Sequence, residues 1–442
     1  MAASTSPPAA RPPLHTILPP LILGTATFNT QYVPDPRAMP YRDIVARAIS
    51  LGITAFDTSP YYGPSEELVG DALASLDQDK HPRSSYRIIT KAGRIGSYEF
   101  DYSPAWIRYS VLRSLRRLRT PYLDLVYTHD VEFVSPQEVL AAVRELRRLR
   151  DEDGVIRYVG ISGFPVDTLC ELAEMVLRET GEPLDAVMSY GNFTLQNRRL
   201  GLPLVLPDYH EQEGEEGKKA SPLARLKEAG VSVVPNASML GMGLLTSRGI
   251  PADSEPSEAP TQEQPAMLAK WHPSPPALRV VCKRLAELAS AAGERLESVA
   301  LRWSLSEWAW IGAVAGVGVD YEHASRSNNK LGVSVCGVSS IAELEETVAE
   351  WRGALSAIGL VKDTGDEKEA RARQEKVMRL VREQLWPALG SWLDHAWDSP
   401  KKGYVNTRPE AERGVVPDDG IIAEYEEVKR SRQAAHTGAG PS

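Results

Sequence analysis

Apolar and polar residues alternate along this chain with a period that switches repeatedly between residues 21 and 357. Short runs rich in β-branched residues are followed by longer stretches in which apolar positions recur at helical spacing. This pattern predicts strand and helix units repeated around a parallel sheet. The strand-like runs are Leu21–Thr25, Ile53–Asp57, Arg87–Lys91, Leu123–His129, Val155–Ile161, Ala186–Tyr190, Val231–Asn236 and Val333–Val338. Eight such units close on themselves, so the expected fold is α/β, a single (β/α)₈ TIM barrel.

The longer stretches predict the helices of this barrel. They are Tyr41–Leu51, Glu66–Leu76, Pro104–Leu118, Pro136–Arg150, Val166–Arg178, Leu223–Ala229, Pro276–Ala292 and Ile341–Ala357, with a long gap before Pro276. Two of them begin with a serine followed by a proline, at Ser103 and Ser135. A hydroxyl at the N-cap and a proline at the first helical position are typical of helix starts.

The predicted barrel has additions at both ends and within it. Residues 1–20 are rich in Ala, Ser and Pro and are expected to form a flexible arm, and residues 21–360 form the barrel. Residues 361–410 are expected to be a helical appendage, and residues 411–442 a disordered tail. Three irregular stretches, 200–220, 250–276 and 316–330, are interpreted as loop insertions.

Composition and charge narrow the class of protein. With 42% hydrophobic and 25% charged residues, the chain has enough apolar material for a large core. Its net charge of -9 disfavours nucleic acid or an anionic membrane as a partner. No apolar run reaches the roughly 18 residues that a membrane span needs. The three cysteines lie far apart in the sequence, without the spacing of a metal site or a disulfide framework, which favours a cytoplasmic protein.

Four titratable side chains are expected to meet at the mouth of the barrel. Asp57, Lys91 and His129 end the second, third and fourth predicted strands, and Tyr62 lies in the turn just after Asp57. Catalytic groups of such barrels sit at the carboxyl ends of the strands. Each residue alone has an ordinary alternative, such as a turn cap, a solvated lysine, a packed imidazole or a turn tyrosine. Their coincidence at successive strand ends favours a shared chemical role.

These side chains suit proton transfer to or from an alcohol oxygen during hydride transfer. A tyrosine with a pKa near ~10 is a weak base at neutral pH. An ammonium from Lys91, oriented by Asp57, is expected to lower the pKa of Tyr62, and His129 to hold the substrate oxygen. No metal is required, and the ligand spacing of a zinc site is missing from the sequence.

The stretch Phe56-Asp57-Thr58-Ser59-Pro60-Tyr61-Tyr62-Gly63 resembles the signature of the aldo-keto reductase family. The segments Gly93-Arg94-Ile95-Gly96 and His129-Asp130-Val131-Glu132 are similar to the NAD-dependent D-arabinose 1-dehydrogenases of fungi in that family, and to the L-galactose dehydrogenases of plants. The resemblance implies that Tyr62, Lys91, Asp57 and His129 are the catalytic tetrad. It also implies oxidation of an aldose at C1 to the 1,4-lactone with NAD, on the route to D-erythroascorbate.

No G-x-G-x-x-G follows the first strand, so a Rossmann nucleotide site is not expected. The resemblance instead implies that the cofactor contacts residues at the barrel mouth: Gly24, Thr25, Ala26, Ser162, Ser189, Asn236 and Ser238. Three positions depart from the family pattern, because Gly163 replaces an asparagine, Ser189 an amide and Asn236 a stacking tyrosine.

The adenosine end of the cofactor is expected at Gly337, Ser339, Glu343 and Glu346. Relatives that use NADP carry Lys and Arg where this chain has Gly337 and Glu343. A carboxylate repels a 2′-phosphate and accepts a hydrogen bond from a free ribose hydroxyl, so NAD is favoured over NADP. An ordinary alternative for Glu343 is an exposed acid on the last helix.

Two other functions stay open from the sequence. One is an NADPH-dependent carbonyl or aldehyde reductase, and the other is a regulatory subunit that binds nucleotide without catalysis. The expected partner is a small-molecule sugar, with Trp106, Phe133, Tyr190 and Trp271 as candidate walls of its pocket. The oligomeric state is not predicted.

Overall fold

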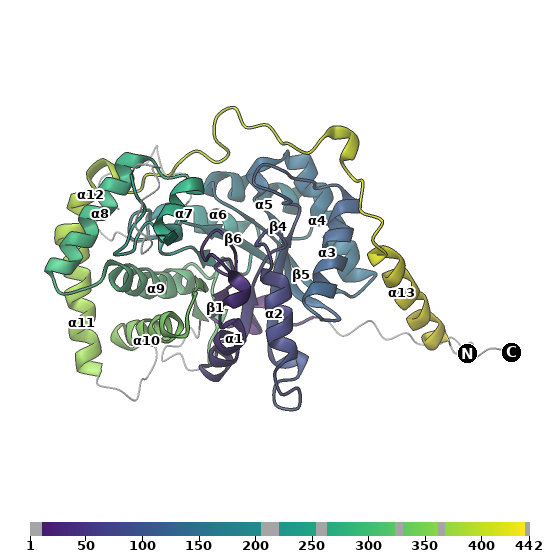
Figure 1. The fold of residues 1–442 in the computed structure, drawn as a ribbon, viewed down its shortest axis with the longest axis horizontal. Helices are drawn as coiled ribbons and strands as arrows, with labels where there is room; N and C mark the ends of the chain where they lie inside the picture. The colour runs from purple at the N-terminus through teal and green to yellow at the C-terminus, as the bar shows by residue number, and fades with distance from the viewer. Residues whose placement is uncertain (1–10, 205–220, 253–262, 323–329, 361–366, 438–442) are drawn as a thin grey trace.

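A closed barrel of parallel strands forms the centre of the molecule (Figure 1). The structure is a computed structural model, and it describes residues 11–204, 221–252, 263–322, 330–360 and 367–437. Around the barrel the strand order is β1-β10-β7-β6-β5-β4-β3-β2. These strands are β1 (Leu21–Gly24), β2 (Ala55–Asp57), β3 (Arg87–Ala92), β4 (Leu123–His129), β5 (Ile156–Gly163), β6 (Ala186–Tyr190), β7 (Asn236–Ala237) and β10 (Ser334–Gly337). The predicted (β/α)₈ barrel is confirmed.

Helices cover the outside of the barrel. They are α1 (Tyr41–Ser50), α2 (Ser65–Ala74), α3 (Pro104–Arg117), α4 (Pro136–Asp151), α5 (Val166–Thr180), α6 (Pro222–Glu228), α9 (Leu296–Val314) and α10 (Ile341–Ala357). The two predicted caps are present, since the side chains of Ser103 and Ser135 accept hydrogen bonds from the amides of Trp106 and Glu138. These caps start α3 and α4 where the sequence placed them.

The helix predicted over Pro276–Ala292 is present, but the sequence analysis missed the helix that follows it. The stretch predicted as Pro276–Ala292 forms α8 (Pro276–Ala291), but the helix that leads into β10 is α9. Helix α9 packs along α10, and the indole of Trp308 donates to the carbonyl of Val333, just before β10. Its residues are buried on almost every side, so it carries no amphipathic pattern for a sequence reading to detect.

The amino-terminal end of the barrel is closed by residues expected to form a flexible arm. Leu14, in the 3₁₀ turn η1 (Leu14–Thr16), and Leu18 are buried against Val319 and Val333. The described part of the insertion 316–330 lies here as well, because β8 (Val319–Asp320) and β9 (Lys330–Leu331) pair beside η1. Residues 1–10 and 323–329 lie outside the described residues. Within residues 11–20, the apolar side chains fill the barrel floor because it would otherwise be open to water.

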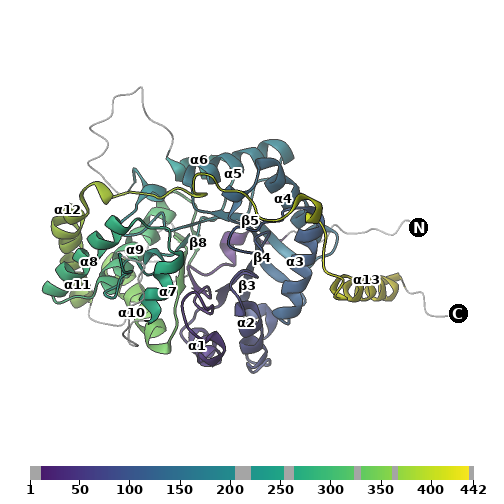
Figure 2. The same ribbon diagram turned by 45° about the horizontal axis from the view of Figure 1, so that its top comes forward.

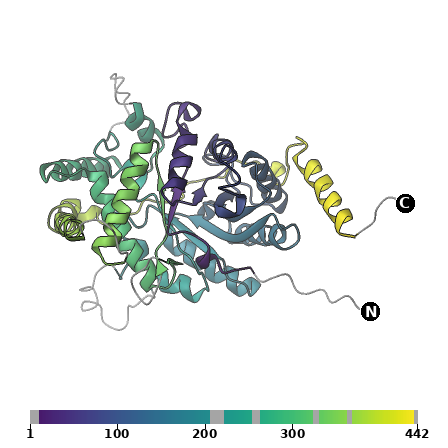
Figure 3. The same cartoon turned by 90° about the horizontal axis from the view of Figure 1, so that it is seen from below.

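The carboxyl-terminal part of the chain runs from one side of the barrel to the other. Helices α11 (Glu367–Leu380) and α12 (Trp386–Leu389) lie beside α10 and α8. The chain then passes along the barrel mouth, seen as the yellow segment in Figures 1 and 2, and ends in α13 (Ile421–Thr437). Figure 3 shows α13 at the periphery, where Ile421 packs on Trp106 and Tyr109 of α3. The tail expected to be disordered from 411 onward therefore contains a helix.

The other two insertions are described in part. Residues 205–220 and 253–262 lie outside the described residues, and the stretch 250–276 contains α7 (Glu263–Trp271). Among the described helices, we find none that combines the length and apolarity needed to cross a bilayer.

Candidate active site

A cavity of about 1050 Å³ opens at the carboxyl ends of the barrel strands. All four members of the predicted tetrad, Asp57, Tyr62, Lys91 and His129, line it. They come from β2, the turn after β2, β3 and β4, which lie next to one another in the barrel. The four side chains therefore meet at the mouth of the barrel, as the sequence predicted.

Lys91 and Asp57 form a buried ion pair at the base of the cavity. The Lys91 ammonium donates to Asp57 Oδ1 at 2.6 Å and to the Thr58 carbonyl at 3.0 Å. Burial raises the pKa of Asp57, and the charge and hydrogen bond of Lys91 oppose that rise. Because breaking a buried pair leaves an uncompensated charge, this pair holds the ammonium in one place.

The structure corrects the expected effect on Tyr62. The Lys91 ammonium lies over the face of the Tyr62 ring, 4.9 Å from its centroid, and its hydrogen bonds go to Asp57 and Thr58 instead. Burial and the nearby carboxylates of Asp57 and Asp130 raise the pKa of Tyr62 well above 10. The phenol is therefore protonated at neutral pH in this state of the protein, and the predicted lowering of its pKa was wrong.

His129 is neutral and has a defined orientation. Burial, together with the positive charges of Lys91 and Arg94, lowers its pKa well below 6.5. Its Nδ1 lies 3.0 Å from Ser59 Oγ, which itself accepts the Tyr61 amide at 3.1 Å. The serine hydroxyl is then free to donate to Nδ1, which leaves the proton on Nε2. A neutral imidazole with a protonated Nε2 is suited to donate to a substrate oxygen.

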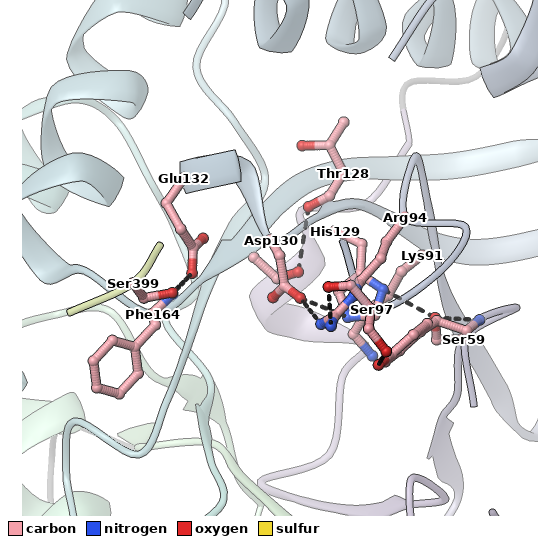
Figure 4. A network of polar contacts seen from close by, with 12 residues as sticks. Ser59, Lys91, Arg94, Ser97, Thr128, His129, Asp130, Glu132, Phe164 and Ser399 are labelled. Atoms are coloured by element: carbon pink, nitrogen blue, oxygen red, sulfur yellow. Dashed lines mark hydrogen bonds and ion pairs between the residues drawn. The ribbon is translucent and has the colours of Figure 1, made fainter. Parts of the chain in front are cut away.

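A second ion pair lines the same cavity, between two residues that stand in the family-like segments of the sequence analysis but were given no role there. Arg94 follows β3 and Asp130 follows β4, and the two side chains are joined by a short hydrogen bond. Figure 4 shows them beside His129 and Lys91. Asp130 Oδ2 is 3.8 Å from Nε2 of His129. The available sequence signal was their position, with Asp130 one residue beyond the end of β4 and Arg94 two residues beyond the end of β3.

Glu132 occupies the space beside Gly163, the position where the family pattern has an asparagine. Its Oε1 accepts hydrogen bonds from the Phe164 amide at 3.1 Å and from Ser399 Oγ at 2.9 Å. A Cβ on Gly163 would lie 2.5 Å from the other oxygen of this carboxyl group, so a larger residue does not fit there without movement. Burial and the charge of Asp130 raise the pKa of Glu132 to about 8.

The predicted cofactor residues divide into two groups. Those that line the cavity are Gly24, Ala26, Ser162, Ser238, Gly337, Ser339, Glu343 and Glu346. Thr25, Ser189 and Asn236 are buried behind its wall. The Thr25 hydroxyl donates to the Asp57 carbonyl, and the side-chain amide of Asn236 donates to the Phe193 carbonyl. The Ser189 hydroxyl accepts a hydrogen bond from the side-chain amide of Asn192.

The cavity extends to the amino-terminal end of α10, where its residues fit a dinucleotide. Gly337 leaves the backbone accessible, and the first amides of the helix are natural donors to anionic oxygens. Glu343 accepts hydrogen bonds from the amide and hydroxyl of Ser339 at 2.7 and 2.9 Å, and Glu346 pairs with Arg295. The lining at this end holds the carboxylates of Glu343 and Glu346 together with the guanidinium groups of Arg248 and Arg295.

Three of the four aromatic residues expected as pocket walls line the cavity, namely Phe133, Tyr190 and Trp271. Trp106 does not, because it packs outside the barrel near α13. Trp397, which the sequence analysis assigned to the appendage, supplies a wall instead. Its ring stacks on Phe164 with centroids 4.9 Å apart.

Comparison with known proteins assigns the family. Residues 20–357 match the Aldo/keto reductase family, a span that holds the whole barrel and the four side chains, and the chain belongs to this family. It is thus an oxidoreductase of a family that uses nicotinamide cofactors.

Two curated relatives are similar over most of their length. D-arabinose 1-dehydrogenase of Saccharomyces cerevisiae is 41% identical over 297 residues, which cover 67% of this chain and 77% of that protein. L-galactose dehydrogenase of Arabidopsis thaliana is 29% identical over 347 residues, which cover 78% of this chain and 86% of that protein.

Proposed function

We propose that this protein oxidises an aldose at C1 to the aldono-1,4-lactone with NAD⁺, with D-arabinose as the first candidate substrate. The observation that carries the proposal is the grouping of Asp57, Tyr62, Lys91 and His129 in one cavity. The two relatives named for dehydrogenation of sugars support the substrate class. A lactone of this kind belongs on a route to D-erythroascorbate.

The four side chains divide the proton chemistry among them. His129 donates from Nε2 to the oxygen on C1 and orients it. Tyr62 accepts the hydroxyl proton in its phenolate form. Lys91, fixed by Asp57, keeps a positive charge against the phenol ring as the negative charge develops.

The phenolate is not favoured by the protein alone, because the pKa of Tyr62 is raised. When bound, NAD⁺ accepts hydride from C1 and brings a positive ring into the cavity, which favours the phenolate. The side chains of the cavity alone therefore do not favour the phenolate of Tyr62, and we infer that the bound cofactor is also needed to lower the pKa of Tyr62.

NAD is the proposed cofactor in preference to NADP. Glu343 and Glu346 line the far end of the cavity, and Arg295, one of the cations that line it, is already paired with Glu346. A 2′-phosphate would therefore meet negative charge, whereas a free ribose hydroxyl finds acceptors. The bonds from Ser339 hold the Glu343 carboxylate at the start of α10.

The test is the change in absorbance at 340 nm with a panel of aldoses and both cofactors at equal concentration. The proposal expects D-arabinose and sugars of matching configuration to be oxidised, faster with NAD⁺ than with NADP⁺. Preference for NADPH and simple aldehydes would instead identify a carbonyl reductase. Tight binding of cofactor with no turnover of any substrate would identify a regulatory subunit.

A further inference from the structure

We propose that Asp130 and Arg94 select the substrate by binding the hydroxyl on the carbon next to the one that reacts. The inference rests on the proposed aldose oxidation and goes beyond it, because it assigns the recognition of C2 to residues outside the tetrad. Both side chains line the cavity. In Figure 4 Asp130 lies beside His129 on the side away from Ser59.

The position of the Asp130 carboxylate carries the argument. Its Oδ2 lies 3.8 Å from His129 Nε2, the nitrogen that would hold the oxygen on C1. Oxygens on adjacent sugar carbons are separated by about one hydrogen-bond length. With the C1 oxygen on Nε2, the C2 hydroxyl therefore comes within reach of Asp130 and can donate a hydrogen bond to its carboxylate.

Arg94 fixes this carboxylate and favours its charged form. Its guanidinium bonds to Asp130, donates to the carbonyls of Gly96 and Ser97 at 3.3 Å each, and stacks on the Tyr61 ring at 3.7 Å. Burial raises the pKa of Asp130, and the charge of Arg94 opposes that rise. A planar group held on so many sides offers its remaining donors to a hydroxyl in a fixed direction.

The arrangement is costly for the fold, which argues for a functional role. The two side chains are only 17% and 2% exposed. Asp130 also has φ 58° and ψ 63°, in the left-handed region that a side chain makes unfavourable. Buried charges and strained backbone at the mouth of a cavity are typical of binding sites.

The proposal predicts that the protein distinguishes a sugar with a hydroxyl on C2 from one that lacks it. A site built to bind a hydroxyl rejects an analogue that lacks it, because the buried polar groups then stay unpaired. The probes are D-arabinose and 2-deoxy-D-ribose, which is the same pentose without the hydroxyl on C2. We expect kcat/KM of the wild type to favour D-arabinose by about 10- to 100-fold.

The variant Asp130→Asn keeps the shape of the side chain and removes its charge. We expect it to reduce the preference for D-arabinose by about tenfold, through D-arabinose alone. A purely structural role would lower kcat for both sugars equally and leave their ratio unchanged. Arg94→Lys, which keeps the charge but loses the forked contacts, is expected to reduce the ratio severalfold, and it tests the proposal if Asp130→Asn does not fold.

The matched control is Asp124→Asn, at the other end of the same strand β4. Asp124 pairs with Arg83 at 2.7 Å, and the two side chains are 15% and 2% exposed, like the pair in the cavity. We expect this variant to keep the wild-type ratio. Binding of NADH and thermal unfolding report whether each variant is folded.

Two results would overturn the inference. One is a ratio that Asp130→Asn leaves within about twofold of the wild type, and the other is a wild type that oxidises both sugars equally well. A wild type that oxidises no aldose with either cofactor would refute the proposed function itself, and the inference would fall with it.

Discussion

At the scale of single residues, Tyr62 contacts both the imidazole of His129 and the ammonium of Lys91. Its ring stands perpendicular to that of His129 with centroids 5.7 Å apart, and the Lys91 ammonium lies against its face. We expect Tyr62→Phe to lower kcat by about 10²- to 10⁴-fold, the usual contribution of a positioned acid or base. Stopped-flow or steady-state absorbance at 340 nm measures this loss.

Tyr109→Phe is the control for Tyr62→Phe. Tyr109 lies on α3, where its hydroxyl donates to Asp419, far from the cavity. It is expected to keep wild-type activity. If Tyr62→Phe oxidised aldoses at the wild-type rate, the proposed proton acceptor would be wrong.

The raised pKa of Tyr62 predicts the direction of the pH dependence. The reactive form in oxidation is the phenolate, and a pKa well above 10 leaves little of it at neutral pH. We therefore expect kcat/KM for NAD⁺, which reports the protein before the cofactor binds, to rise by about tenfold per pH unit at and above neutral pH. Titration of His129 does not contribute to the profile in this pH range, because its lowered pKa keeps the imidazole neutral.

The reverse direction provides the internal control for this pH profile. Reduction of the lactone by NADH uses the protonated phenol, and the same raised pKa keeps that form abundant, so its rate should not rise with pH. An oxidation profile that is level from pH 7 upward would mean that another group accepts the proton.

At the scale of elements, the sequence predicts the strands well and the additions poorly. Short apolar runs with regular spacing identified all eight barrel strands, and the rule that chemistry lies at strand ends led to the four side chains that line one cavity. The strand predicted as Val231–Asn236 is shorter, since β7 spans Asn236–Ala237 and Val233 makes only an isolated bridge. Helix α9 was missed because it is buried all round.

The site was predicted in part for similar reasons. Arg94 and Asp130 stand in the loops just after β3 and β4, where no periodic pattern marks them. Trp397 reaches the cavity from a segment more than 230 residues beyond its stacking partner Phe164. Contacts between residues so distant in sequence depend on the path of the whole chain, which local patterns do not encode.

The segment that carries Trp397 closes one side of the cavity, and its contribution can be measured. The Trp397 ring stacks on Phe164 and meets the edge of His272. We expect Trp397→Ala to raise KM for the sugar by roughly tenfold, because an aromatic wall of the pocket is lost. The KM for the cofactor should change little, since α10 adjoins a distant part of the barrel.

Trp310→Ala is the matched control for Trp397→Ala. Trp310 lies on α9, is 38% exposed and does not line the cavity. Both KM values should stay at the wild-type level. An unchanged KM for sugar in Trp397→Ala would mean that the substrate does not reach this wall.

At the scale of the whole molecule, the residues of the proposed reaction lie at one end of the barrel, and a cluster of apolar residues that contributes to stability lies at the other end. The tetrad and the proposed hydroxyl-binding pair lie at the carboxyl ends of the strands. The opposite end is closed by the segment before β1, through Leu14, Leu18 and a hydrogen bond from the Ser334 amide to the Pro20 carbonyl at 2.9 Å. Changes at the closed end should therefore alter stability without altering catalysis.

Leu14→Ala tests this separation. Leu14 is 2% exposed, and truncating a buried leucine removes apolar contacts and leaves a cavity, which costs about 2–5 kcal/mol of unfolding free energy. Urea denaturation measures that loss, and kcat/KM for the sugar should equal that of the wild type. Val280→Ala, at a residue 57% exposed on α8, should change the unfolding free energy by less than about 0.5 kcal/mol. Equal stability of Leu14→Ala and the wild type would mean that residues 11–20 do not seal the barrel, and lost activity at full stability would mean that the two ends are coupled.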